Sequence, residues 1–254
     1  MSSQTAILRR AYHTLFLLLT ILLCQRLRSQ PAARDTVLTD SGYADALALY
    51  HDFLTPETGL FKGTEYADYA HLLRNGHPFY GEDKFKIGTI SYQGIRYKNV
   101  PILYDIVYDQ VIIGDYYHIF KIILTSQLID RFTIEDHSFI RQTDSITPGL
   151  PRVGFYEELY TGRITLLKRE SKQIQEDLNS GDHAQRFIEG TDSSYWLRMG
   201  NVYYPVNHYK SLFAALKDKK KEVRRFIRSS DLSMRKNREI TLTKVAAWYD
   251  SSPH

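Results

Sequence analysis

The chain has 254 residues, which is enough for one well-packed domain or two small ones. Its 33 Lys and Arg side chains outnumber 29 Asp and Glu side chains, so the formal charge is +4, a value that suggests an anion-binding protein. The chain contains one cysteine, Cys24, which excludes a disulfide within it.

The N-terminal segment has the layout of a secretory signal peptide. A pair of arginines precedes the apolar run TLFLLLTILLC, residues 14–24. That run is shorter than the roughly 20 apolar residues that a membrane-spanning helix needs. A positive flank before a short apolar core is typical of export. We therefore expect residues 1–29 to be a signal peptide that is cleaved between Ser29 and Gln30, because Ser29 is small.

Lipid attachment and an uncleaved membrane anchor are the two alternatives to cleavage after Ser29. Lipid attachment at Cys24 is disfavoured because Leu23 precedes it, where such processing requires a small residue. An uncleaved anchor is disfavoured because Arg26 and Arg28 end the apolar run abruptly. Loss of Cys24 with the signal leaves a mature chain with no disulfide, thiolate nucleophile or cysteine metal ligand. We expect an exported protein, periplasmic or secreted, with the lipoprotein as the less favoured form.

The charge of the mature chain is zero on this interpretation, but it is distributed unevenly. From Tyr209 to Lys244 there are 12 basic and 4 acidic side chains, whereas from Gln30 to His208 there are 17 basic and 24 acidic ones. An acidic body with a basic tail indicates either an anionic partner or a tail that lies against its own body. The near-cancellation of the two charges favours the second.

The body is expected to be a β domain. Residues 30–42 are small and polar, and we expect them to be disordered. The domain proper, residues 43–208, begins with a short helix in YADALALYHDFL. From Phe85 onward, short runs of Ile, Val, Tyr and Phe alternate with turn signals such as Gln93-Gly94, which predicts antiparallel hairpins. Because the connections are too short for parallel crossovers, we expect a meander.

The C-terminal segment, residues 209–250, is expected to form a basic helical hairpin packed on the same domain. Several strands carry apolar groups on both faces, which predicts a sheet that is curved, partly closed or covered by helices. The fold class is therefore α+β, mainly β: an antiparallel meander, curved or partly closed, with a C-terminal helical hairpin packed on it. The expected buried positions are Leu212, Leu216, Val223 and Ile227 in the first helix, and Ile240, Val245, Trp248 and Tyr249 in the second.

One candidate polar site lies in HLLRNGHPFYGED, which contains His71, His77, Glu82 and Asp83. Histidines near carboxylates can bind a metal ion or act as acid and base. The two histidines are six residues apart across an Asn-Gly pair, which is not the spacing of a helical metal pair. A polar loop ahead of the first long strand is the favoured interpretation.

Acidic pairs give a second candidate. Asp105 and Asp109 suggest glycoside hydrolysis, in which two carboxylates flank the scissile bond. Aspartate is also common at turns, and a turn role for both residues is favoured over the hydrolytic one. Glu157 and Glu158 are adjacent in a strand, so their side chains face opposite ways. Motifs of serine hydrolases, phosphate loops, dinucleotide sites and zinc peptidases do not occur, so we expect no cofactor and no metal, and a non-enzyme more than an enzyme.

The run KDKKKEVRRFIR is the leading candidate for a binding surface. Its basic side chains include Lys217, Lys220, Arg224 and Arg228. Basic residues on one helical face and apolar residues on the other suit contact with an anionic membrane surface. The same pattern describes a core-facing helix with a solvated outer side, which is commoner and favoured. Nucleic acid is disfavoured as a partner, because an exported protein would rarely meet it.

Several blocks carry a resemblance to a known group. GTEYADY, GHPFY and GTISYQGIRYKNVPILYDIVYDQVII, together with the C-terminal block SLFAALKDKKKEVRRFIRSSDLSMRKNREITLTKVAAWYD, resemble exported proteins of unknown function from Bacteroidota. The resemblance covers roughly residues 60–250 and implies export and a periplasmic or envelope setting. It brings no catalytic residue with it.

The expected function is non-enzymatic binding or scaffolding of another cell-envelope component, whose identity and oligomeric context the sequence leaves open. The alternative is a carboxylate-dependent hydrolase that acts on envelope or polysaccharide substrates. A cleft with two carboxylates about 5–10 Å apart would favour the hydrolase. A solvent-facing basic stripe beside uncovered apolar groups would favour a membrane surface as the partner.

Overall fold

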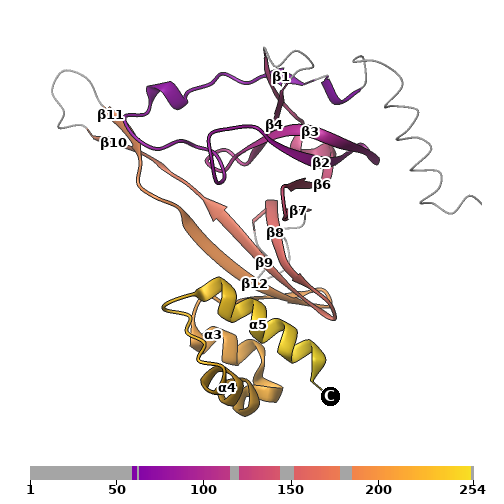
Figure 1. Cartoon of the computed structure of the whole chain (residues 1–254), viewed down its shortest axis with the longest axis vertical. Helices are drawn as coiled ribbons and strands as arrows, with labels where there is room; N and C mark the ends of the chain where they lie inside the picture. The colour runs from indigo at the N-terminus through magenta and orange to yellow at the C-terminus, as the bar shows by residue number, and fades with distance from the viewer. Residues whose placement is uncertain (1–58, 62, 115–119, 144–151, 178–184, 253–254) are drawn as a thin grey trace, which may run out of the picture. The chain divides into compact units, whose positions relative to one another are not determined.

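Most of the described strands assemble into one long antiparallel sheet (Figure 1). The computed structural model describes residues 59–61, 63–114, 120–143, 152–177 and 185–252, which all belong to one compact unit, Ala44–His254. Within these residues, eleven strands form a sheet in the order β1-β5-β4-β3-β2-β6-β7-β8-β9-β12-β13. The predicted fold class is confirmed: a mainly β, antiparallel meander carries C-terminal helices, and the sheet is curved but not closed.

The strands of the sheet are β1 (Thr64–Glu65), β2 (Lys86–Tyr92), β3 (Ile95–Asp105), β4 (Gln110–Gly114), β5 (Lys121–Ile123), β6 (Ile129–Ile134), β7 (His137–Gln142), β8 (Gly154–Thr161), β9 (Ile164–Ser171), β12 (Asp192–Met199) and β13 (Val202–Pro205). A separate hairpin pairs β10 (Ile174–Asp177) with β11 (Gln185–Ile188) and continues the ribbon formed by β9 and β12 (Figure 1). The helices are α3 (Tyr209–Ala215), α4 (Lys220–Ser229) and α5 (Arg238–Ser251), and short 3-10 turns are η2 (Gly59–Phe61), η3 (Ala70–Leu72), η4 (Ser126–Leu128) and η5 (Lys217–Lys219).

The meander follows from local turn chemistry. Gln93 and Gly94 join β2 to β3 and have φ angles of 54° and 76°. Positive φ at both central residues is the requirement of the hairpin turn whose twist matches the flanking strands. Glu135 between β6 and β7, and Gly200 between β12 and β13, also have positive φ. The predicted hairpins at these positions are therefore confirmed.

The sheet curves so that strands distant in its order come into contact. The turn between β3 and β4 reaches β8 and β9, where Asp109 pairs with Arg169 at 3.2 Å and accepts the Tyr104 hydroxyl at 2.6 Å. Gly154 makes this approach possible. A Cβ atom there would lie 2.0 Å from Oδ2 of Asp109, and its φ of +145° disfavours other residues.

Two large apolar cores lie against the sheet. The first is surrounded by the curved strands and contains Ile90, Ile102, Phe132, Phe139 and Phe155, all of which are almost fully buried. The second lies beneath the helices and includes Leu166, Leu197, Leu212, Leu216, Val223, Ile227, Leu242 and Val245. A smaller cluster, with Phe79 and Leu103 at its centre, covers the opposite face of β3. The apolar groups on both faces of the strands are thus used by different cores.

The C-terminal helices confirm most of the predicted packing and correct part of it. Leu212, Leu216, Val223 and Ile227 are buried, as predicted. The prediction of a single first helix is wrong. Leu216 leaves helical geometry (φ −101°, ψ 47°), and η5 separates α3 from α4. The prediction that Ile240 is buried is also wrong, because this side chain is 50% exposed. In α5 the buried stripe runs instead through Thr241, Leu242, Val245, Ala246 and Tyr249.

Several predictions lie outside the described residues. These are the signal peptide at 1–29, its cleavage between Ser29 and Gln30, the alternative at Cys24, the disordered segment 30–42 and the short helix that follows. In the part of the chain that the structure describes, no helix is long and apolar enough to cross a membrane.

Candidate functional site

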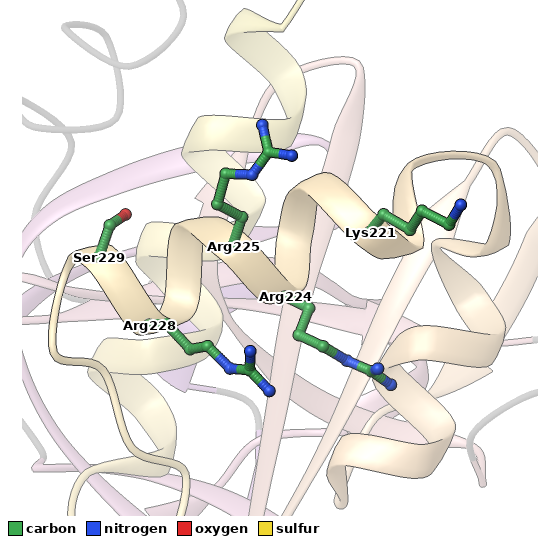
Figure 2. A pocket seen from close by; sticks show the side chains of 5 residues that line it. All are labelled: Lys221, Arg224, Arg225, Arg228 and Ser229. Atoms are coloured by element: carbon green, nitrogen blue, oxygen red, sulfur yellow. The ribbon is translucent and has the colours of Figure 1, made fainter.

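The outer side of α4 carries a continuous basic face. Val223 and Ile227 are buried against the second core. Because an α-helix has 3.6 residues per turn, Lys221, Arg224 and Arg228 share a different side of α4, and all three are exposed. Figure 2 shows the side chains of Arg224 and Arg228 leaving the same side of the helix. We call Lys221, Arg224, Arg225 and Arg228 the basic face of α4.

An open depression of about 480 Å³ lies on the basic face (Figure 2). It is lined by the four basic side chains and by Ser229. No carboxylate lines it, so the field inside the depression is positive and attracts anions. The hydroxyl of Ser229, at one end of the lining, donates a hydrogen bond to the backbone carbonyl of Phe226 at 3.1 Å.

In the part of the chain that the structure describes, the cations of this region are not engaged in ion pairs. Among the described residues, no ion pair involves Lys217, Lys220 or any residue of the basic face. The ion pairs between α5 and the sheet have the opposite polarity, because α5 supplies the acids Glu239 and Asp250. The interpretation that the basic tail docks on an acidic body is therefore not supported in this part of the chain.

A stack of rings holds one of the arginines in place. The guanidinium carbon of Arg224 lies 5.0 Å from the centre of the Phe213 ring. Phe213 in turn stacks on Tyr209, with ring centres 5.9 Å apart and an interplanar angle of 20°. The Tyr209 hydroxyl accepts a hydrogen bond from the backbone N–H of Met234 at 3.0 Å. Arg224 thus has a fixed support, which an exposed arginine normally lacks.

The apolar side chains of α4 pack within the domain: Val223 and Ile227 are buried. Phe226 stacks on Trp248 with ring centres 5.1 Å apart, and Phe213 lies beneath Arg224. A helix that inserts into a membrane interface needs apolar side chains exposed beside its cations. Here those side chains are engaged within the domain, so the basic face suits a ligand that stays in water.

The predicted basic residues are only partly brought together. Arg224 and Arg228 line the depression, whereas Lys217 lies in η5 and Lys220 begins α4, and both are exposed outside it. The sequence prediction omitted Lys221 and Arg225 from its candidate residues. The spacing of three and four residues among 221, 224, 225 and 228 is the signal that finds them.

The structure does not assemble the candidate polar site into a metal site. His71 lies in η3 and is exposed, whereas His77 stacks on Phe79 with ring centres 6.1 Å apart. Burial, with a contribution from nearby Lys172, lowers the pKa of His77. Glu82 pairs with Lys86 at 3.3 Å, and Asp83 is exposed. In the described ranges no group of three or more His, Cys, Asp and Glu residues could hold a metal ion.

Asp105 and Asp109 serve separate structural roles. Asp105 is fully buried and accepts hydrogen bonds from the hydroxyls of Tyr66 and Tyr69 at 3.0 and 2.8 Å. Its other oxygen accepts two backbone N–H groups of the following turn. Burial, followed by the charge and hydrogen bond of Asp105, raises the pKa of Tyr66. Asp109 instead pairs with Arg169 at 3.2 Å, so the two carboxylates have different partners.

A second polar cluster, which the sequence did not predict, is centred on Lys168 of β9. Its Nζ lies 3.4 Å from Glu157, 2.7 Å from Glu170 and 2.8 Å from Glu239. Burial lowers the pKa of Lys168, but hydrogen bonds to Glu170 and Glu239 outweigh it and the net shift is upward. Nδ1 of His137 lies 2.5 Å from Oε1 of Glu157. The buried carboxylate of Glu157 is therefore balanced by these partners.

The adjacent acids Glu157 and Glu158 face opposite sides of the sheet, as predicted. Glu157 is buried in the Lys168 cluster, whereas Glu158 pairs with Arg131 of β6 at 3.1 Å. The two carboxylates have separate partners and do not act on one another.

Comparison with known proteins finds no family model, no curated protein and no solved structure that matches the chain.

Proposed function

We propose that the protein is an exported, non-enzymatic component of the cell envelope that binds an anionic partner through the basic face of α4. One observation carries this proposal: four cationic side chains line one open depression, and none has a carboxylate partner among the described residues. The signal-like N-terminus and the resemblance to exported proteins of Bacteroidota support the envelope setting.

The weakness of exposed ion pairs indicates what kind of anion is bound. Each exposed pair contributes about 0.2–1 kcal/mol. Four such pairs together reach at most about 4 kcal/mol, which corresponds to a Kd of about 1 mM. A small anion would therefore bind weakly. A polyanion gains affinity because, once one of its charges is bound, its other charges are held close to the remaining cations. We propose a polyanion as the partner.

Charge reversal tests this proposal. Arg224→Glu with Arg228→Glu places two negative charges on the basic face, and Arg96→Glu with Lys98→Glu makes the same charge change on exposed positions of β3. Binding of the full chain to fluorescent polyphosphate and poly-glutamate is measured by anisotropy over a range of salt concentrations. We expect the first variant to lose at least tenfold in affinity and the second to bind like the wild type, with affinity falling as salt rises. Equal losses in both variants would show that net charge alone, and not this face, attracts the polyanion.

A further inference from the structure

We infer that the polyanion bound at the basic face carries phosphate groups, and that Arg224 and Arg228 hold one phosphate between two guanidinium forks. This inference rests on the proposed function and names the chemistry of its partner.

The relative position of the two arginines supports a shared ligand group. They are four residues apart in α4, which corresponds to roughly 6 Å along the helix axis. Figure 2 shows both side chains extending to the same side of the helix and lining the same depression. Two arginines that are one helical turn apart and extend to the same side of the helix can reach one ligand group from two directions.

The geometry of the donors favours phosphate over carboxylate. A guanidinium is a planar fork that donates two parallel hydrogen bonds. A carboxylate has two oxygens in one plane, so one fork uses its two syn lone pairs and a second fork is left with the anti lone pairs. A phosphate group has additional oxygens outside that plane, which leaves acceptors for a second fork. A site with two forks therefore discriminates between the two anions, whereas a site of lysines would recognise only charge.

Phe213 prepares Arg224 for this role. The guanidinium of Arg224 lies over the Phe213 ring, and Phe213 is supported by Tyr209. A side chain that is already held in its bound orientation loses less freedom on binding, so more of the interaction remains as affinity. Phe213 is a positioning residue, because it acts on the ligand through Arg224.

The packing of α4 favours a phosphate-bearing polymer over a phospholipid surface. Val223 and Ile227 are buried, and Phe226 stacks on Trp248, so α4 exposes no apolar row for insertion between lipids. Lys221 and Arg225 line the same depression and are available to neighbouring phosphates of a polymer. A polymer thereby uses all four cations of the basic face.

The deciding experiment compares polymers of different chemistry on variants of equal charge. The affinity of the full chain is measured for polyphosphate and for poly-glutamate of matched charge, and for vesicles that contain phosphatidylglycerol. Arg224→Lys with Arg228→Lys keeps both charges and removes both forks. Arg74→Lys with Arg96→Lys is the matched control at exposed positions outside the C-terminal helices.

For the wild type and the control variant, we expect polyphosphate to bind at least tenfold more tightly than poly-glutamate. For the double lysine variant, this ratio should fall close to one. Equal affinity for the two polymers, or an unchanged ratio in the lysine variant, would overturn the inference. Binding to the vesicles without binding to polyphosphate would overturn it in favour of a lipid surface.

The positioning role of Phe213 has its own readout. Phe213→Leu keeps an apolar side chain in the second core and removes the ring beneath Arg224. We expect a several-fold loss of polyphosphate affinity, and no further loss when Phe213→Leu is combined with Arg224→Lys. A loss that is equal in both backgrounds would refute the role of the ring. Because Arg224 is exposed, the lysine variants test the inference even where Phe213→Leu lowers the yield of folded protein.

The outcomes separate this inference from the proposed function. If charge reversal abolishes binding but the lysine variants leave it unchanged, the basic face is a general polyanion site and the phosphate assignment fails alone. If charge reversal has no effect on either polymer, both proposals fail.

Discussion

Lys168 of β9 and Glu239 of α5 form an ion pair with 2.8 Å between Nζ and Oε2. The lysine side chain is only 8% exposed, and it also contacts Glu157 and Glu170. This contact connects the buried polar cluster of the sheet with the last helix. Among the described residues, the ion pairs between α5 and the body thus use acids of α5, Glu239 and Asp250, and none uses a cation of α4.

Removal of the Lys168 charge should be strongly destabilising. Lys168→Met leaves Glu157, whose side chain is 5% exposed, without its cation, and breaking a buried pair in this way costs about 3–5 kcal/mol. Glu239→Gln should cost less than about 1 kcal/mol, because the Glu239 side chain is 42% exposed. Urea unfolding of both variants measures the difference. Equal losses in the two variants would show that the cluster does not depend on Lys168. The double variant Lys168→Met with Glu157→Gln should recover part of the stability that Lys168→Met loses.

Gly154 should be intolerant of any side chain. Gly154→Ala introduces a Cβ atom 2.0 Å from Oδ2 of Asp109 at a φ of +145°, and we expect a loss of about 1–3 kcal/mol from the strained backbone together with a further loss from the clash. Gly190→Ala is the matched control, since Gly190 has a φ of +107° and nothing within 4 Å of the added atom. Thermal unfolding of the two variants separates strain from clash. If Gly190→Ala is as damaging as Gly154→Ala, the contact with Asp109 is not the cause.

The end of α5 should give the domain a pH-dependent contribution to stability. Desolvation raises the pKa of Asp250, but hydrogen bonds from Tyr160 and Arg163 outweigh it and lower the pKa below its ordinary value. A carboxyl whose folded pKa is depressed stabilises the fold above its unfolded pKa, and this contribution is lost as the pH falls through its folded pKa. Asp250→Asn should therefore lower the Tm at pH 7.

This difference in Tm should shrink as both proteins are taken to pH 3. The matched control is Asp192→Asn at the exposed start of β12, and its Tm should follow the wild type at both values. A gap between Asp250→Asn and the wild type that is as large at pH 3 as at pH 7 would contradict the linkage.

Export predicts a shortened mature chain. The intact mass of the protein from fractionated native cells should correspond to a soluble species that begins at Gln30, because the apolar run before it is too short to span a membrane. A membrane-bound species lipidated at Cys24 would show an anchored lipoprotein instead. A full-length mass would refute export with cleavage.

The sequence by itself determined the features that depend on neighbours along the chain. The turn at Gln93-Gly94 needs only local backbone chemistry, and the hairpins of the meander follow from such turns. The burial of Val223 and Ile227 on one side of α4 follows from helical periodicity. The position of Arg224 and Arg228 on one side of the helix could be predicted for the same reason, because they are four residues apart.

Only the tertiary structure decided which groups distant in sequence meet. The sequence favoured a turn role for Asp105 over a catalytic pair with Asp109, but it could not show that the hydroxyls of Tyr66 and Tyr69 donate hydrogen bonds to the Asp105 carboxylate. The break at Leu216 lies where the helical pattern continues in sequence, and side chains from both α3 and α4 enter the second core. Whether the cations of α4 would be neutralised depended on which acids lie beside them. Ionic contacts act over a few ångströms in space regardless of sequence separation, so composition alone could not settle their pairing.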